Sequence, residues 1–211
     1  MTNRRGLFIT FEGTDGLGKS TNLSYFSDLA QKQGISVEIS REPGGTPLGE
    51  EIRTILIDGS LDSMNSMTEL LLILASRANH ITSRIEPALA AGKWFLCDRF
   101  SDATYAYQGG GRRIDNRIIE QLEELTNVGL TPDFTFLFDA PPEIGLSRAS
   151  NRGEPDRFEK EEIDFYRRVR SAYLELVKKN PKHKLLIDAT QSIPSIQKIL
   201  VKQFNLLLSS W

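Results

Sequence analysis

The chain has 211 residues, of which 39% are hydrophobic and 26% charged, so its composition is that of a globular protein and excludes a disordered one. A formal net charge of −2 is unlike the basic surface of a protein that coats a nucleic acid polymer, so we expect phosphate recognition to be local and made by a few arginines. The single cysteine, Cys97, excludes an intrachain disulfide framework, and the lack of a signal-like N-terminus or an apolar run of about 18 residues predicts a soluble, cytoplasmic protein without a membrane segment.

The first predicted elements are a strand, a glycine-rich turn and the start of a helix. Residues 7–11 have strand composition, and Gly13, Gly18, Lys19 and Ser20 match the pattern G-x-x-x-x-G-K-S/T. Such a turn points backbone N–H groups into a concavity, and the helix adds the positive end of its dipole, so the motif predicts a phosphate-binding loop. We expect Lys19 to reach the β- and γ-phosphates of a nucleotide and Ser20 to ligate Mg²⁺. The alternative is a glycine-rich turn that only connects strand and helix.

After the phosphate loop, the sequence predicts the rest of the first helix, a short strand, a Pro- and Gly-rich segment and a second, short helix. The first helix should end near Gln33, before Gly34, and residues 37–39 alternate as in a short strand. The Pro- and Gly-rich segment 41–47 then stands where a doubly wound sheet keeps its ligand crevice, although a plain surface loop is the alternative. A short helix that carries Arg53 should follow.

A second long helix is predicted over residues 67–81, with an expected buried stripe of Met67, Leu70, Leu71, Leu74 and Ala78. Ile73 and Arg77 lie four residues apart on a neighbouring face and should therefore be adjacent in space. Without other information, an arginine beside a core stripe is most often at a solvated edge.

The run 94–97 is apolar throughout, as expected for a strand buried on both faces, and Asp98 and Arg99 follow at once. Charges at the carboxyl end of such a strand lie where open α/β sheets bind ligands, so a functional role is the favoured interpretation. Segment 101–111 combines tyrosines, a glutamine and three consecutive glycines, which predicts flexible backbone, either a substrate wall or an ordinary loop.

The rest of the chain continues the alternation of strands and helices. Strands are predicted at residues 134–138 and 185–187, and helices at 142–148, 166–176 and 196–208. The segment 148–159 is rich in arginine and interrupted by Gly and Pro; such a run is most often a solvated face. The alternation predicts an α/β fold with a mainly parallel sheet and helices on both faces, organised as one domain over residues 1–211 with a small lid at about 148–160.

A phosphate loop alone does not separate kinases, switch GTPases, motors and non-catalytic nucleotide binders. The chain lacks the Asn-Lys-x-Asp run of guanine-specific GTPases, but it has arginines at four separated places: Arg53, Arg77, Arg99 and the segment 148–157. This distribution suits phosphoryl transfer between two nucleotides, which depends on positioning and electrostatics. Because a phosphate monoester has a second pKa of about 6, a phosphate acceptor needs no strong general base, which favours a nucleoside monophosphate kinase.

Several motifs together make the chain resemble bacterial thymidylate kinases. They are FEGTDGLGKST, REPGGTPLGEEIR, LLILASRANH, DRFSDATYAYQGGGR, RASNRGEPDRFE, the helix from Phe165 and the Ile187-Asp-Ala-Thr run. The resemblance implies a three-layer P-loop NTPase fold with a five-stranded parallel sheet, a homodimer, and transfer of the γ-phosphoryl group of Mg·ATP to dTMP. The rival hypotheses are a kinase for another nucleoside monophosphate and a non-catalytic P-loop nucleotide-binding regulator.

The resemblance also assigns residues to ATP and Mg²⁺. The implied ATP-binding residues are Gly13, Thr14, Asp15, Gly16, Leu17, Gly18, Lys19, Ser20 and Thr21. Ser20 would ligate the metal and Asp98 would hold it through water. The implied catalytic residues are Lys19, Asp98, Arg99 and Arg152, the last as the lid arginine on the transferring phosphoryl group.

On the acceptor side, the resemblance places Arg99 on the phosphate of dTMP and makes Arg53 and Arg77 further acceptor-side arginines. Asp15 would approach the 3′-hydroxyl group, and Tyr107 would crowd the 2′ position and so disfavour ribonucleotides.

Four residues are matched to the sugar and base. Glu42 and Pro43 would line them, while Thr104 and Gln108 would form hydrogen bonds with thymine.

Gly16 leaves the phosphate loop without the basic residue of some eukaryotic relatives, so that the lid should supply the charge, which is the bacterial arrangement. Two positions depart from the family. Leu17 stands where the family usually has a small residue. Ile73 replaces the phenylalanine that the family commonly stacks on thymine, and Phe100 is a candidate to compensate.

Overall fold

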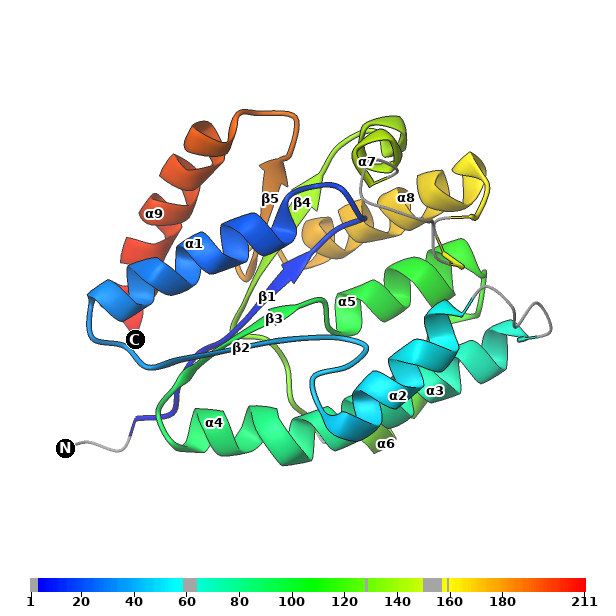
Figure 1. Cartoon of the computed structure of the whole chain (residues 1–211), viewed down its shortest axis with the longest axis horizontal. Helices are drawn as coiled ribbons and strands as arrows, with labels where there is room; N and C mark the ends of the chain where they lie inside the picture. Colours follow the sequence, from blue (N-terminus) through cyan, green and yellow to red (C-terminus); the bar gives the residue numbers. More distant parts are fainter. Residues whose placement is uncertain (1–3, 59–63, 128, 150–156, 159) are drawn as a thin grey trace.

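The computed structural model describes residues 4–58, 64–127, 129–149, 157–158 and 160–211. In this part of the chain, five parallel strands form one sheet in the order β2-β3-β1-β4-β5 (Figure 1). The strands are β1 (Phe8–Glu12), β2 (Val37–Arg41), β3 (Trp94–Asp98), β4 (Phe134–Asp139) and β5 (Lys184–Asp188). The predicted parallel α/β sheet is therefore confirmed.

Helices cover both faces of the sheet. They are α1 (Lys19–Lys32), α2 (Pro47–Ile57), α3 (Ser66–His80), α4 (Glu86–Ala90), α5 (Ser101–Thr104), α6 (Asn116–Thr126), α7 (Pro142–Ala149), α8 (Ile163–Lys179) and α9 (Ile193–Ser210), with π-helical turns η1 (Ile81–Ile85) and η2 (Tyr105–Gly111). Among the helices that the structure describes, none has both the length and the apolar character needed to cross a membrane.

The central strands are apolar without interruption because both of their faces are buried. On β3, Trp94 and Leu96 pack with α1 and α9, whereas Phe95 and Cys97 pack on the opposite face with η1 and α4. Successive side chains of a strand point to opposite faces, so a strand between two helical layers needs apolar residues at every position. The result is a three-layer fold, in which α1 and α9 lie side by side on one face (Figure 1).

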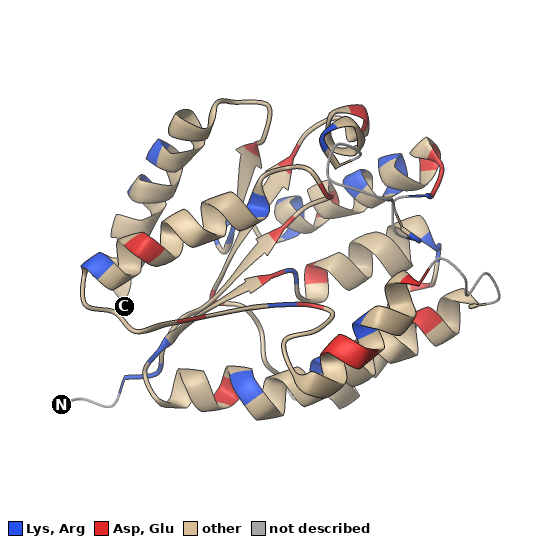
Figure 2. Ribbon diagram, viewed as in Figure 1, with Lys and Arg blue, Asp and Glu red and all other residues tan. Residues whose placement is uncertain are grey.

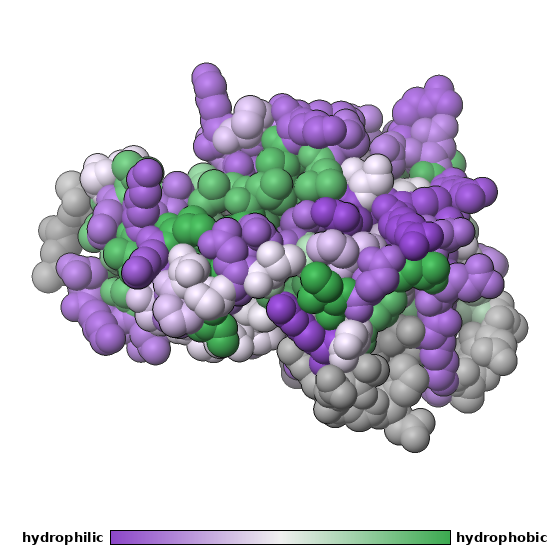
Figure 3. Space-filling view, turned by 90° about the horizontal axis from the view of Figure 1, so that it is seen from above, coloured by the Kyte–Doolittle hydropathy of each residue, from purple (hydrophilic) through white to green (hydrophobic). Residues whose placement is uncertain are grey.

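The carboxyl ends of the strands carry charged residues. Glu12, Asp98, Asp139 and Asp188 end four of the strands, and Arg41 ends β2; Figure 2 shows the acidic ends in red along one edge of the sheet. Seen from above in Figure 3, the molecule presents hydrophilic side chains interspersed with hydrophobic patches. The edge formed by the carboxyl ends is the part of the sheet that concerns the site. This edge lies next to the glycine-rich turn that follows β1.

The predicted buried stripe of α3 is wrong at two positions. Met67 and Leu71 are 39% and 49% exposed and Ala78 is half-buried, whereas Leu70 and Leu74 are buried as expected. The helix turns the Leu70 side toward Ile119 of α6 and the Ile73 side toward α2. The choice of buried face thus depends on where α2 and α6 pack.

The flexible backbone predicted for segment 101–111 is also wrong, because the segment is helical as α5 and η2. Its glycines allow close packing against α8. A Cβ atom at Gly110 would lie 2.8 Å from the Cβ of Ala172, and one at Gly111 would lie 2.4 Å from the ring of Phe165. The glycines therefore serve helix packing, and the segment forms a rigid wall beside the sheet.

Candidate active site

The glycine-rich turn between β1 and α1 has a conformation that requires its glycines. Gly13 and Gly16 have φ angles of 129° and 77°, in the left-handed region. A Cβ atom at Gly13 would lie 2.3 Å from the carbonyl oxygen of Phe138, and one at Gly16 would lie 2.1 Å from that of Gly145. Leu17, where a small residue was expected, is buried in the core on the α1 side of the sheet. The turn thus packs its backbone directly on β4 and α7.

Lys19, at the end of this turn, is buried, and its ammonium group forms a hydrogen bond with a backbone oxygen. Its Nζ donates a hydrogen bond to the carbonyl oxygen of Thr14 at 2.8 Å and lies 3.9 Å from a carboxylate oxygen of Asp15. Burial, and after it the neighbouring Arg99, lowers the pKa of Lys19. Burial would by itself raise the pKa of Asp15, but Arg99 and Lys19 outweigh it and hold that pKa at about 2. The turn therefore holds a desolvated cation beside a carboxylate.

At the end of β3, Asp98 faces the start of α1. The Ser20 hydroxyl group donates to Asp98 Oδ2 at 3.3 Å. Among the described residues, the other oxygen, Oδ1, is buried without a hydrogen-bond partner. A buried carboxylate oxygen next to a hydroxyl group suits a hard divalent cation such as Mg²⁺, which prefers oxygen ligands. Thr21, also expected at the nucleotide, is exposed on α1.

Arg99 follows Asp98 in a left-handed conformation, with φ of 70°. Its Nη2 donates to both carboxylate oxygens of Asp15 at 2.9 Å and to the Tyr107 hydroxyl group at 3.1 Å, and its guanidinium lies 4.8 Å from the centre of the Tyr107 ring. A residue other than glycine adopts this backbone conformation only when its surroundings hold it there. The β3 end therefore directs Arg99 back over the phosphate loop.

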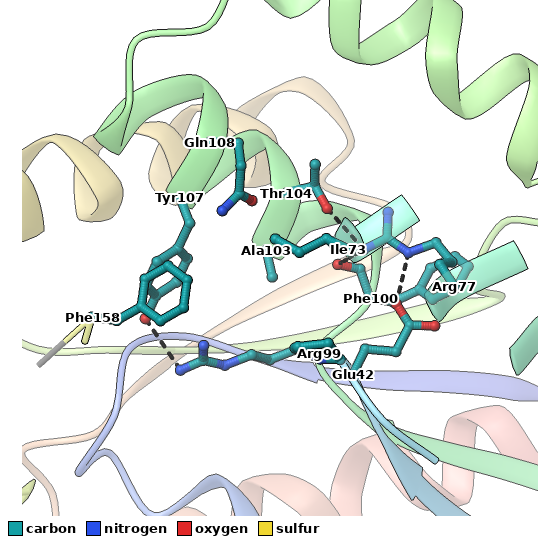
Figure 4. Close-up of a pocket in the computed structure, with 11 residues that line it drawn as sticks. Glu42, Ile73, Arg77, Arg99, Phe100, Ala103, Thr104, Tyr107, Gln108 and Phe158 are labelled. Carbon is teal, nitrogen blue, oxygen red and sulfur yellow. Dashed lines mark hydrogen bonds and ion pairs between the residues drawn. The ribbon is translucent and has the colours of Figure 1, made fainter. Parts of the chain in front are cut away.

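A small cavity of about 50 Å³ opens next to Arg99 (Figure 4). Its lining residues are Glu42, Pro43, Ile73, Arg77, Arg99, Phe100, Ala103, Thr104, Tyr107, Gln108 and Phe158. A second cavity of about 100 Å³ shares Glu42, Pro43, Arg99 and Phe158 with it and adds Asp15, Arg41, Arg53, Ile57 and Asp98. The structure thus brings all the residues expected on the acceptor side into two adjoining cavities beside the phosphate loop.

Arg77 is 1% exposed and is not at the solvated edge that its sequence context suggested. It donates from Nε to Glu42 at 2.6 Å and from Nη2 to Thr104 Oγ1 at 2.8 Å (Figure 4). Its Nη1 donates to Glu123 at 2.7 Å. It also lies 4.9 Å from the centre of the Phe100 ring. A buried guanidinium with this many partners is fixed in place, and so are the side chains around it.

Aromatic rings wall the cavity that Ile73 enters. Ile73 is buried and lines the cavity together with Arg77, as their spacing predicted. Phe100, the expected substitute for the missing aromatic, lies in the same cavity, and sequence analysis missed Phe158, whose ring centre is 5.9 Å from that of Tyr107. No periodic pattern in the sequence pointed to Phe158, because it stands in a polar, arginine-rich segment without regular apolar spacing.

Arginines in the expected lid bind structural partners. Arg148 belongs to the last turn of α7 and donates to the carbonyl oxygen of Ala189 at 3.0 Å. Arg157 donates to Glu69 at 2.6 Å. Gln108, expected at the base, also donates to Glu69, at 2.8 Å. Arg152 lies outside the described residues, as does most of the lid expected at 148–160.

Sequence analysis also missed Glu12, a fully buried carboxyl group at the end of β1. It accepts hydrogen bonds from the Phe100 backbone N–H at 2.7 Å and from the Tyr173 hydroxyl group at 3.0 Å. Burial, reinforced by Asp102, raises its pKa from 4.5 to about 8. Glu12 therefore ties the residue after Arg99 to β1 and α8 and keeps its proton at neutral pH.

Replacement of Glu12 by glutamine should change how stability depends on pH. In the folded protein Glu12 ionises near pH 8, and in the unfolded chain near 4.5, so its contribution to the free energy of unfolding is fully present below about 4.5 and is lost as the pH rises through 8. The unfolding free energy of the unsubstituted protein, minus that of Glu12→Gln, should fall by about 1.4 kcal/mol per pH unit in this window. Urea unfolding of both proteins from pH 6 to 8 measures it, and parallel curves would contradict the raised pKa.

The parallel sheet, the glycine-rich turn after its first strand and the adjoining cavities define a P-loop nucleotide-binding protein with a second site beside its phosphate loop. Residues 11–199 match the family described as Thymidylate kinase. A thymidylate kinase of Pseudomonas syringae pv. tomato is 52% identical over 197 residues, covering 93% of this chain and 94% of that protein. One of Chromobacterium violaceum is 48% identical over 206 residues, covering 97% and 96%. The crystal structure of thymidylate kinase from Ehrlichia chaffeensis superposes with a TM-score of 0.78 at 34% identity, covering 95% of this chain and 99% of that one. This chain belongs to the thymidylate kinase family.

Proposed function

We propose that the protein transfers the γ-phosphoryl group of Mg·ATP to dTMP, giving dTDP for dTTP synthesis. The observation that carries the proposal is that Asp98 and Arg99, at the end of β3, contact Ser20 and Asp15 on the phosphate-loop side, while Arg99 lines both acceptor-side cavities and Asp98 lines one of them. Phosphoryl transfer needs donor and acceptor phosphates in line, with positive charge on both. A turn that faces both sites meets this need.

An assay of ADP formation across a panel of nucleoside monophosphates tests this function. We expect strong turnover with dTMP and much weaker turnover with dUMP, AMP, CMP and GMP. Turnover that is greatest with another monophosphate would identify a different kinase of this class. ATP binding without turnover on any of them would identify a nucleotide-binding regulator.

On the ATP side, the proposal assigns Lys19 to the β- and γ-phosphates. Phosphate oxygens would take the place of the Thr14 carbonyl oxygen as hydrogen-bond acceptors for its ammonium group. Ser20 would ligate Mg²⁺, and Asp98 would hold it through water. The ion neutralises charge on the phosphates when it is bound. Asp98 Oδ1, buried next to Ser20, supports this assignment.

On the acceptor side, Arg99 and Arg53 would bind the phosphate of dTMP, since both line the cavity that also holds Asp15. Asp15 would then approach the 3′-hydroxyl group, and Tyr107 would crowd the 2′ position. The cavity of about 50 Å³, which Ile73 also lines, would take the base, with Arg77 as the arginine at its inner end.

The remaining assignments concern the base itself. Thr104 and Gln108 would form hydrogen bonds with thymine, and Glu42 and Pro43 would line it and the sugar. Their support is that all four line the cavity with Ile73.

Replacement of Ile73 by phenylalanine should lower the KM for dTMP several-fold and leave the KM for ATP nearly unchanged. The side chain enters the acceptor cavity from α3 beside Arg77, so an aromatic ring there would offer the base a stacking face. Stacking of an aromatic side chain on a base contributes about 1–3 kcal/mol in single-strand binders. Steady-state kinetics with both substrates varied measures the effect.

The matched control is Ile73→Leu, which changes shape without adding a ring. An unchanged or raised KM for dTMP in a folded Ile73→Phe protein would show that residue 73 does not face the base, or that Phe100, Tyr107 and Phe158 already fill its place.

We further propose a homodimer that buries the apolar side of α2, α3 and α6. These neighbouring helices carry exposed apolar residues, namely Leu48, Ile55, Met67, Leu71, Ile118 and Leu125. Helix α8 buries Phe165, Tyr166, Val169 and Tyr173 within the protein, so these residues are not offered as a dimer surface. Sedimentation equilibrium of the protein and of Leu71→Glu tests the dimer; a monomer before substitution would contradict it.

The organisation as one domain over residues 1–211, with a lid at about 148–160, is part of the same proposal, as is a cytoplasmic location. Arg152 of this lid would contact the transferring phosphoryl group. Its neighbour in sequence, Arg148, is bound to Ala189, which supports the choice of Arg152.

A further inference from the structure

His80, the last residue of α3, is fully buried between β2 and the start of the 41–47 segment. Its Nδ1 lies 2.9 Å from Glu42 Oε1, and its Nε2 lies 2.7 Å from Ser40 Oγ. The ring also packs edge-on against Phe95, at 5.6 Å between centres. His80 lines neither of the two acceptor-side cavities, whereas Glu42 lines both.

The chemistry of the partners sets the direction of these hydrogen bonds. Glu42 forms a 2.6 Å ion pair with Arg77, and an ionised carboxylate only accepts hydrogen bonds, so His80 Nδ1–H must be the donor to Glu42. In the neutral tautomer with its hydrogen on Nδ1, Nε2 accepts a hydrogen bond from the Ser40 hydroxyl group. A continuous chain then runs from Ser40 through His80 and Glu42 to Arg77.

This chain of hydrogen bonds gives the buried Glu42–Arg77 ion pair its remaining partner. A buried carboxylate is held in one geometry only when hydrogen bonds use its remaining lone pairs. Arg77 is fixed from its own side by Thr104 and Glu123, while on the Glu42 side His80 supplies the second contact. Figure 4 shows the Glu42 carboxylate directed at Arg77 at the inner end of the cavity.

The backbone of the 41–47 segment packs onto the same contact. A Cβ atom at Gly45 would lie 2.3 Å from Ser40 Oγ and 2.5 Å from His80 Nε2. The segment can therefore follow its path only with glycine at position 45. Through this contact His80 fixes both the Glu42 side chain and the course of the segment that carries it.

The order Ser40, His80, Glu42 is also that of a hydrolase triad, but the surroundings do not suit nucleophilic catalysis. An acyl-transfer site needs backbone N–H groups aimed at a developing oxyanion. The N–H groups of Gly44 and Gly45, which lie nearest in the segment, donate to Ser76 and Glu50. The Glu42 carboxylate is moreover paired with Arg77.

We propose that His80 is a positioning residue for the acceptor nucleotide: it holds Glu42 and, through it, Arg77 in the geometry that binds the base of a nucleoside monophosphate. The proposal rests on the proposed function. It assigns His80 an effect on acceptor binding and none on the ATP site. In the described part of the chain, the side-chain hydrogen bonds of Ser40, His80, Glu42 and Arg77 join these residues to one another and to Phe100, Thr104 and Glu123, and none of these bonds is to the phosphate loop.

A matched pair of substitutions tests the proposal. In His80→Asn the amide nitrogen can take the place of Nδ1 and keep the bond to Glu42, whereas in His80→Gln the amide reaches the place of Nε2 and keeps only the bond to Ser40. Both lose the ring and its packing on Phe95. Because a hydrogen bond to a charged group contributes roughly a tenfold effect or more, His80→Gln should raise the KM for dTMP about tenfold, and His80→Asn clearly less. The KM for ATP should change little in either.

Calorimetric titration of the protein with dTMP in the absence of ATP supplies a second readout, in which His80→Gln should weaken binding about tenfold. Equal dTMP affinities for the two variants, or equal changes in the KM values of dTMP and ATP, would overturn the positioning role. If unsubstituted protein fails to bind dTMP, the proposed function itself is wrong. Should His80→Gln not fold, Ser40→Ala replaces it: the KM for dTMP should rise two- to threefold, on the order of one neutral hydrogen bond, and no rise would overturn the proposal.

Discussion

Replacement of Lys19 by alanine is expected to lower kcat by about 10²- to 10³-fold, the usual effect of removing one group that stabilises transition-state charge. Lys19 is the buried cation of the phosphate loop, and its Nζ lies on the Thr14 carbonyl oxygen, where phosphate oxygens can replace it. Burial makes its charge effective, since a desolvated ammonium group interacts strongly with an anion. Steady-state kinetics at saturating ATP and dTMP measures the loss.

The fold should survive this substitution. Lys19 contributes to the phosphate loop and to no apolar cluster, so its truncation removes one hydrogen bond to Thr14 and little packing. Lys19→Met is the control, because it keeps most of the stem and removes only the charge. We expect it to be as inactive as Lys19→Ala, with both unfolding near the urea midpoint of the unsubstituted protein. Near-native turnover of either variant would refute the assignment of the phosphate loop.

Replacement of Arg152 by alanine is expected to lower kcat by about 10³-fold and to raise either KM far less. An arginine that contacts the transferring phosphoryl group acts mainly in the transition state, where charge develops. This prediction rests on the sequence, in which Arg152 stands between glycine- and proline-interrupted polar residues. Initial rates over a grid of both substrate concentrations separate kcat from the two KM values.

The structure supports a source of this positive charge outside the phosphate loop. A side chain at position 16 of the phosphate loop would start 2.1 Å from the Gly145 carbonyl oxygen, so the loop in this conformation has no room for an arginine of its own there. Arg148 and Arg157 are bound to Ala189 and Glu69. Arg148→Ala is therefore the control and should leave kcat within a fewfold of the unsubstituted value. If Arg152→Ala changes only a KM, the segment is a binding edge, and Arg148 or Arg157 becomes the better candidate.

Local sequence determined the parts of this protein that depend on neighbours along the chain. The phosphate loop follows from the spacing of Gly13, Gly18 and Lys19, because the turn is made by consecutive residues and its geometry needs glycine. The parallel sheet follows from continuous apolar runs such as 94–97, since only strands covered on both faces are apolar at every position. The charges after such a strand, Asp98 and Arg99, then lie at the ligand-binding edge.

Tertiary structure alone decided which polar groups meet and which helix faces are buried. The glycines 109–111 look like a flexible loop in sequence, but they are needed because α6 packs closely on Gly109 and α8 packs closely on Gly110 and Gly111. Met67 and Leu71 fit the apolar period of α3 equally well, but α2 and α6 pack on its other side. Ser40, His80 and Glu42 form their chain because β2 and the end of α3 cross at one point. A periodic pattern reports which residues share a face, whereas contacts between distant segments depend on how the elements are placed.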